Sequence, residues 1–113
     1  LKDVEKIEYL SKSDEVEFDA FGKTIEIFDA QDKVIIYDNV KLVKKEQDYQ
    51  IESNHAMYKK SDGYIIFTEN PVVTQVDETS ACVYKGEKIL YYPDTKKTSI
   101  EGSVQVECTK LKQ

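Results

Sequence analysis

The amino-acid sequence predicts an all-β domain built of stacked antiparallel strand repeats. Three observations predict this fold class. The apolar residues are strand formers, apolar and polar residues alternate along the chain, and one short sequence pattern recurs at a near-constant spacing. Tyr occurs 8 times and Phe 4 times beside many Val and Ile, with one Met and no Trp. Aromatic and β-branched residues favour strands. No segment shows the apolar stripe of a helix.

Length and charge narrow the classes of protein to which the chain could belong. Its 113 residues suffice for one domain, predicted over residues 1–113, with 40% apolar residues for a core and 34% charged residues to cover it. The net charge of −6 argues against nucleic-acid binding and against docking on an anionic membrane. No apolar run suits a spanning helix or a secretory leader. Because the chain begins at Leu1 rather than Met, we expect a mature or trimmed fragment, and a preceding leader or anchor stays open.

The N-terminal part is the least regular. The segment VEKIEYLSKSDEVEF (4–18) alternates apolar and polar residues loosely, so residues 1–22 are predicted as a degenerate first unit. End units of repeat proteins are commonly atypical. Residues 23–107 carry the clear repeats, and residues 108–113 are predicted as a tail.

Three turns led by an aromatic residue follow in order. They read FDAQDKV (28–34), YKKSDGY (58–64) and YPDTKKT (92–98). Each combines an aromatic residue with five polar or turn-forming residues before the strand resumes. Each turn is therefore predicted to join two short strands as a hairpin does.

A second landmark, here called a corner, follows each turn. The corners read DNV (38–40), ENP (69–71) and GSV (102–104). Asn39 and Asn70 are 31 residues apart, and Asn70 and Ser103 are 33 apart, a spacing typical of stacked supersecondary units. Asn and Gly tolerate the backbone angles that a sharp bend needs, so each unit is predicted to bend at its corner.

The residues on either side of each corner alternate with period two, which predicts one inward and one outward face. Lys41, Glu101 and Gln105 are predicted to face water. Apolar residues at Tyr37, Ile66 and Val72 interrupt the pattern, and the parity of the strands before each turn is left open. Pro71 and Thr98 are placed inward, together with ten residues predicted to line an apolar groove: Val34, Ile36, Val40, Leu42, Ile65, Phe67, Val73, Ile100, Val104 and Val106.

The ordered recurrence of turns and corners resembles the OstA-like family. Its members include the periplasmic lipopolysaccharide-transport proteins A and C and the N-terminal domain of the outer-membrane protein D. The resemblance is carried by KTIEIFDAQDKVIIYDNVKLV, HAMYKKSDGYIIFTENPVVT and KILYYPDTKKTSIEGSVQV, and covers about residues 23–107. The family unit ends in a Gly-Asn-Val or Gly-Asn-Pro corner. Asp38 and Glu69 depart from it, since they stand where the corner glycine is usual.

The resemblance implies an OstA-like β-jellyroll with an open apolar groove and no enzymatic activity or cofactor. It implies that the ten inward residues bind lipopolysaccharide (lipid A) acyl chains in the periplasm of a Gram-negative envelope and pass them toward the outer membrane. It implies partners of the same fold, joined by edge-strand pairing, among them further copies of the chain. Which member of the transport chain this is stays open. The alternative is a structural β-repeat domain that mediates envelope protein assembly without bound lipid.

Catalytic and metal sites are not indicated by the sequence. His55 is the only histidine, with no nucleophile or carboxylate assigned to it, and is interpreted as structural. The acidic turn residues have no spacing of a known calcium loop, and turn chemistry explains them. These residues are Asp29, Asp32, Asp62 and Asp94.

Lysines and cysteines leave two questions open. Lys44, Lys45, Lys59 and Lys60 could relieve the charge of an anionic lipid, but solvated loop lysines are the favoured interpretation. Stacking could bring Cys108 near the region of residues 76–82. A disulfide between Cys82 and Cys108 is one outcome, and two buried thiols are the favoured one.

Overall fold

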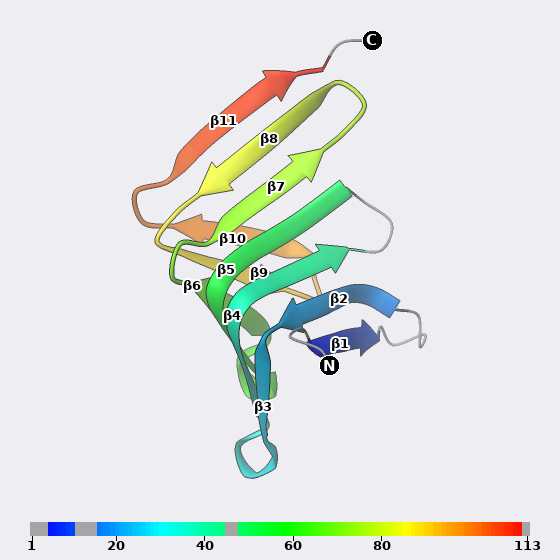
Figure 1. The fold of residues 1–113 in the computed structure, drawn as a ribbon, viewed down its shortest axis with the longest axis vertical. Coiled ribbons are helices and arrows are strands. Elements are labelled where there is room, and N and C mark those ends of the chain that lie inside the picture. Colours follow the sequence, from blue (N-terminus) through cyan, green and yellow to red (C-terminus); the bar gives the residue numbers. More distant parts are fainter. Residues whose placement is uncertain (1–4, 11–15, 45–47, 112–113) are drawn as a thin grey trace.

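The computed structural model describes residues 5–10, 16–44 and 48–111, and these form an antiparallel β structure. Their regular elements are eleven strands and two short 3-10 turns, with no α-helix among them. No helix in these ranges is long and apolar enough to cross a membrane. All strands belong to one curled sheet resembling a half-barrel (Figure 1). The predicted all-β class is thereby confirmed, with a shape consistent with a β-jellyroll.

The strands follow one another along the chain with short connections. They are β1 (Glu5–Leu10), β2 (Val16–Gly22), β3 (Thr24–Phe28), β4 (Lys33–Lys44), β5 (Asp48–Lys59), β6 (Tyr64–Thr68), β7 (Val72–Val76), β8 (Ser80–Lys85), β9 (Lys88–Tyr92), β10 (Lys97–Glu101) and β11 (Gln105–Lys110).

The sheet folds into two halves because β4 and β5 are long and run through both. The first half has the order β1-β2-β4-β5-β7-β8-β11. The second half has the order β3-β4-β5-β6-β9-β10. Figure 1 shows the first half in front, with β6, β9 and β10 behind it and β3 extending downward. The inner faces of the two halves enclose the core.

The chain passes between the halves at the three predicted corners. Both leading residues of each corner have positive φ: 60° and 53° at Asp38 and Asn39, 64° and 64° at Glu69 and Asn70, and 82° and 49° at Gly102 and Ser103. This left-handed conformation turns the strand sharply and favours Gly and Asn. The bend predicted at every corner is confirmed, although Asp38 and Glu69 adopt it without being glycine.

The turns repeat as closely as the corners. Each ends on a residue with positive φ, Asp32, Gly63 or Lys96, six residues before the first corner residue. The register pairs Phe28 with Lys33, Lys59 with Tyr64 and Tyr92 with Lys97. Lys59, not Tyr58, is therefore the structural equivalent of Phe28, and the predicted alignment of the second turn was wrong by one residue. Gly63, the positive-φ residue, comes five positions after Tyr58, whereas Asp32 comes four positions after Phe28.

A small residue lies beside each corner: Gly22 at the end of β2, Ser53 within β5 and Gly86 between β8 and β9. A Cβ atom added to Gly22 would collide with the side chain of Ile36, and one added to Gly86 with that of Ile100. Ser53, which is buried, lies 31 residues after Gly22 and 33 before Gly86, the same spacings as the corners. The two glycines thus allow the backbone to approach the bend closely.

Both chain ends differ from the simple repeat. Residues 1–4 and 11–15 of the predicted degenerate unit lie outside the described residues; in the described part, β1 pairs with β2 and β2 with β4. The predicted tail at residues 108–113 is partly wrong, because β11 continues to Lys110. Residues 112 and 113 lie outside the described ranges.

Candidate functional site

The candidate site is the groove between the inner faces of the two sheet halves. Cross-strand register stacks apolar side chains in rows along each face, as period-two alternation requires. In the first half one row is Ala20, Leu42, Ile51, Val73, Tyr84 and Val106. In the second half the two rows are Ile25, Ile36, Ala56, Phe67, Ile89 and Ile100, and Ile27, Val34, Tyr58, Ile65, Tyr91 and Thr98.

Eight of the ten predicted groove residues come together in the core. Six are buried, and Val34 and Ile100 are half-buried and pack against those six. The buried six are Ile36, Val40, Leu42, Ile65, Phe67 and Val73.

Val104 and Val106 remain outside this core, with exposed fractions of 48% and 56%. Val106 continues the row of Tyr84, so its parity agrees with the prediction, but its burial does not. All six residues of β11 are exposed, since nothing in the described chain covers this strand. Of the predicted outward residues, Glu101 and Gln105 are exposed and Lys41 is half-buried.

The sequence left open which residues of the strands before each turn face inward, and the cross-strand rows answer this. Ile25, Ala56 and Ile89 share one inner row, and Ile27, Tyr58 and Tyr91 share the next. Tyr91 and Ile89 are fully buried, whereas Ile27, on the edge strand β3, is 66% exposed.

Aromatic side chains close the centre of the groove. Phe18 of the first half meets Tyr91 of the second half edge-to-face, with ring centroids 5.7 Å apart. The Tyr49 ring lies 6.5 Å from that of Tyr91, and its hydroxyl shares a hydrogen bond with the Thr98 hydroxyl. These contacts join strands of both halves, so side chains fill the middle of the groove.

A cavity lies on either side of this closed centre. The N-terminal cavity, about 180 Å³, is lined by apolar parts of β2, β4, β5 and β6. The C-terminal cavity, about 390 Å³, lies between the first half and β10, and falls in the usual size range of ligand pockets. The N-terminal cavity is lined by Phe18, Ala20, Val34, Ile36, Leu42, Ala56, Met57, Tyr58, Ile65 and Phe67, and the C-terminal cavity by Lys44, Tyr49, Val73, Gln75, Tyr84, Lys96, Thr98 and Ile100.

The lysines of the sequence analysis fall in different surroundings. Lys44 lies in β4, half-buried, with its Nζ 4.5 Å from the ring centre of Tyr49 and 4.9 Å from that of Tyr91. A cation over an aromatic face is attracted by the ring quadrupole. The interpretation of Lys44 as a solvated loop lysine is therefore wrong. Lys59 and Lys60 are exposed at the second turn, and Lys45 lies outside the described residues.

Burial raises the pKa of the Tyr49 hydroxyl above its ordinary value of 10.0, and the hydrogen bond with Thr98 opposes part of this rise. The unfolded chain then loses its Tyr49 proton before the folded one does. We expect the free energy of unfolding to keep this contribution below pH 10 and to lose it as the pH rises through the raised pKa. Urea unfolding below and above pH 10 measures this loss of the free energy of unfolding. The Tyr49→Phe variant should lose less free energy over the same pH range. Equal declines in both proteins would contradict the assignment.

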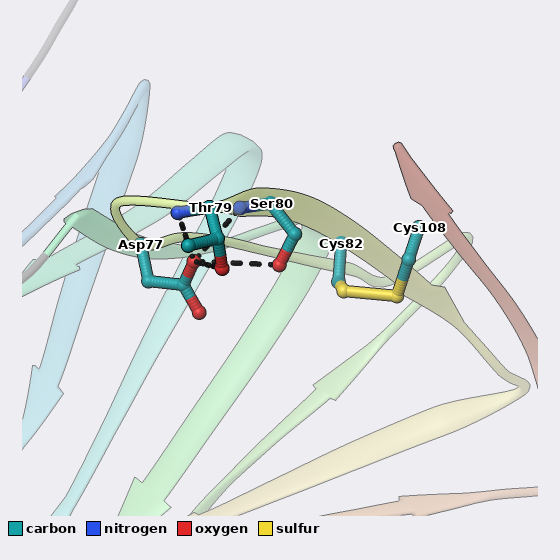
Figure 2. The surroundings of a disulfide bond; sticks show 5 residues. All are labelled: Asp77, Thr79, Ser80, Cys82 and Cys108. Atoms are coloured by element: carbon teal, nitrogen blue, oxygen red, sulfur yellow. Dashed lines mark hydrogen bonds between the residues drawn. A yellow bond between two sulfur atoms is a disulfide. The ribbon is translucent and has the colours of Figure 1, made fainter. Parts of the chain in front are cut away.

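Cys82 and Cys108 form a disulfide, so the favoured interpretation as two buried thiols was wrong. They lie directly opposite each other on β8 and β11, and Cys108 is exposed (Figure 2). The nearby Asp77 carboxylate accepts hydrogen bonds from the backbone N–H groups of Thr79 and Ser80, each at 2.8 Å. These bonds lower the pKa of Asp77 and fix the turn that leads into β8.

His55 and the acidic turn residues lie away from the groove. His55 shares an outward row with Tyr37, whose ring centre is 5.5 Å away, and its Nδ1 is 3.3 Å from the Thr68 hydroxyl. Asp29, Asp32, Asp62 and Asp94 are exposed at successive turns. Among the described residues, no three His, Cys, Asp or Glu side chains converge as metal ligands would.

The chain matches no protein-family model and no curated protein at a significant level.

Proposed function

We propose that the chain is a non-enzymatic lipid-transport module of the OstA-like type. It would bind lipopolysaccharide acyl chains between its sheet halves in the periplasm and pass them toward the outer membrane. The observation that carries the proposal is the pair of facing apolar sheets with a cavity at each end of the groove. Each methylene kept from water is worth about 0.8 kcal/mol, so an acyl chain gains much by entering such a groove.

Movement of a chain along the groove requires the closed centre to open. The halves share a continuous backbone through β4 and β5. Across the groove, Phe18 contacts Tyr91 and Tyr49 bonds to Thr98. The side-chain contacts can part while β4 and β5 act as the hinge. We propose that an entering acyl chain replaces the Phe18–Tyr91 contact.

The sheet edges support end-to-end docking with partners of the same fold. Among the described residues, β3 pairs only with β4, β10 only with β9, and β11 only with β8. An unpaired edge recruits a strand from another chain. The apolar rows end at exposed Ile27 on one edge and exposed Val106 on another, so an added strand would extend the apolar surface. We propose other lipopolysaccharide-transport proteins of this fold, or further copies of the chain, as these partners.

The disulfide supports a periplasmic location. Disulfides persist in oxidising compartments such as the periplasm and are rare in reducing ones. The Cys82–Cys108 bond therefore favours a chain that works outside the cytoplasm.

One observation favours the alternative, an assembly domain that holds no lipid. The centre of the groove is filled by its own side chains, with Leu42, Ile51, Ala56 and Ile89 fully buried. A filled interior with open edges suits a scaffold that only pairs strands with its neighbours.

Photo-crosslinking separates the two functions. Tyr58 is half-buried and lines the N-terminal cavity, whereas Tyr37 is half-buried on the outward face. Each is replaced by p-benzoylphenylalanine and irradiated with purified lipopolysaccharide. The transport proposal expects a lipid adduct at position 58 and none at position 37. Adducts to protein alone at position 58 would favour assembly, and equal lipid adducts at both positions would contradict a groove.

A further inference from the structure

The C-terminal cavity differs from the N-terminal one in charge. Of the eight described residues that line it, Lys44 and Lys96 are cationic and none is acidic. The lining of this cavity thus differs from the composition of the whole chain, which has 22 acidic and 16 basic residues. Within the described ranges, no charged residue lines the N-terminal cavity. The described part of the groove therefore has two lysines at one end and no charged lining residue at the other.

The same cavity combines its cations with an apolar wall. Val73, Tyr84 and Ile100 line it from β7, β8 and β10. Tyr84 and Ile100 also pack against the core. Hydrogen-bonding groups of Tyr49, Gln75 and Thr98 complete the lining. A ligand that suits all these surfaces has an apolar chain and an anionic head.

The surroundings of Lys44 hold its charge in place at the groove. Its Nζ lies 4.5 Å and 4.9 Å from the ring centres of Tyr49 and Tyr91, the two rings that help to close the groove. Lysine side chains commonly bury their methylene stems while the ammonium head stays at the surface. Lys96 reaches the cavity from the turn between β9 and β10. The two lysines approach from opposite sheet halves, so an anion between them would bridge the halves.

We infer that the C-terminal cavity is a subsite for the anionic head of an amphiphile, a phosphate or carboxylate held by Lys44 and Lys96 with its apolar chain along Val73, Tyr84 and Ile100. This inference rests on the proposed function, because it orients the lipid in the groove. Charge-assisted hydrogen bonds from ammonium groups to such an anion are stronger than neutral ones.

Two detergents with the same chain test the subsite. Dodecyl phosphate carries an anionic head, and dodecyl dimethylamine oxide carries a head without net charge at neutral pH. Each displaces a hydrophobic dye from the protein below its micelle concentration. We expect dodecyl phosphate to bind at least about tenfold more tightly, and Lys44→Gln with Lys96→Gln to remove that advantage. The amine oxide should bind the variant and the parent equally.

Matched variants separate charge from folding. Lys59→Gln with Lys60→Gln makes the same change of charge at an exposed turn and should leave both affinities unchanged. Lys44→Arg with Lys96→Arg keeps the cations and should retain the preference for phosphate. Thermal unfolding of each variant shows whether it is folded, and the arginine variant keeps the test valid if the glutamine variant is not.

Each other outcome overturns the inference in a distinguishable way. If the glutamine variant retains the preference for dodecyl phosphate, the lysines do not hold the head, although the groove still binds lipid. If inorganic phosphate competes as well as dodecyl phosphate does, the cavity binds a free anion rather than a lipid head. If neither detergent binds the parent protein, the proposed transport function fails together with the subsite.

Discussion

Replacement of Phe67 by alanine is expected to lower the free energy of unfolding by about 3–5 kcal/mol. Phe67 is 1% exposed, lies between Ala56 and Ile89 in its row, and lines the N-terminal cavity. Its removal enlarges an existing cavity that the rigid sheet cannot close, so lost burial and lost packing add together. Urea unfolding monitored by circular dichroism measures the loss, which is a large share of the stability of a domain this size.

The neighbouring residue supplies the control. Ile66 lies on the same strand with the opposite parity, is half-buried, and pairs with Met57 of β5 and Leu90 of β9. Ile66→Ala should cost roughly 1 kcal/mol. Equal losses for Phe67→Ala and Ile66→Ala would mean that the inward and outward faces of β6 have been assigned wrongly.

Replacement of both Cys82 and Cys108 by serine should lower the free energy of unfolding by about 3.5 kcal/mol, the chain-entropy value for residues 26 positions apart. β11 depends strongly on this bond, because all six of its residues are exposed and β8 is the one strand of the described chain that pairs with it. Without the disulfide, we expect β11 to detach before the rest of the sheet. Hydrogen exchange should then rise in β11 and change little in β4 and β5.

Reduction of the parent protein is the matching control. A reducing agent should lower the stability of the parent to that of the double serine variant and leave the variant unchanged. If the variant is as stable as the oxidised parent, the bond contributes nothing and the pairing of β11 with β8 suffices alone.

The repeat was predictable because its signals are local. Each corner needs two residues with positive φ, a conformation that favours Asn or Gly. Asn39, Asn70 and Gly102 meet this requirement and can be recognised in the sequence. Period-two alternation predicted the buried faces of β4, β6 and β7, because a strand with one face on a core must alternate. The small residues opposite the corners, Gly22, Ser53 and Gly86, carried the same spacing and were missed.

Properties that depend on neighbours in space were not predictable from the pattern. Val106 has the same parity as buried Val73, but its burial requires a strand opposite it, and the described chain supplies none. The pairing of Cys82 with Cys108 follows from the register of β8 and β11, which no local signal fixes. The same holds for Lys44, whose contact with Tyr91 joins residues far apart in the sequence.

The constant number of residues between turn and corner means that the width and the length of the curled sheet are set by different parts of the sequence. Each positive-φ turn residue precedes its corner by six residues, whereas the repeat itself is 31 or 33 residues long. The six-residue segment sets the width of the groove, and the number of tandem units sets its length. Gene duplication could therefore lengthen such a curled sheet unit by unit without changing its width.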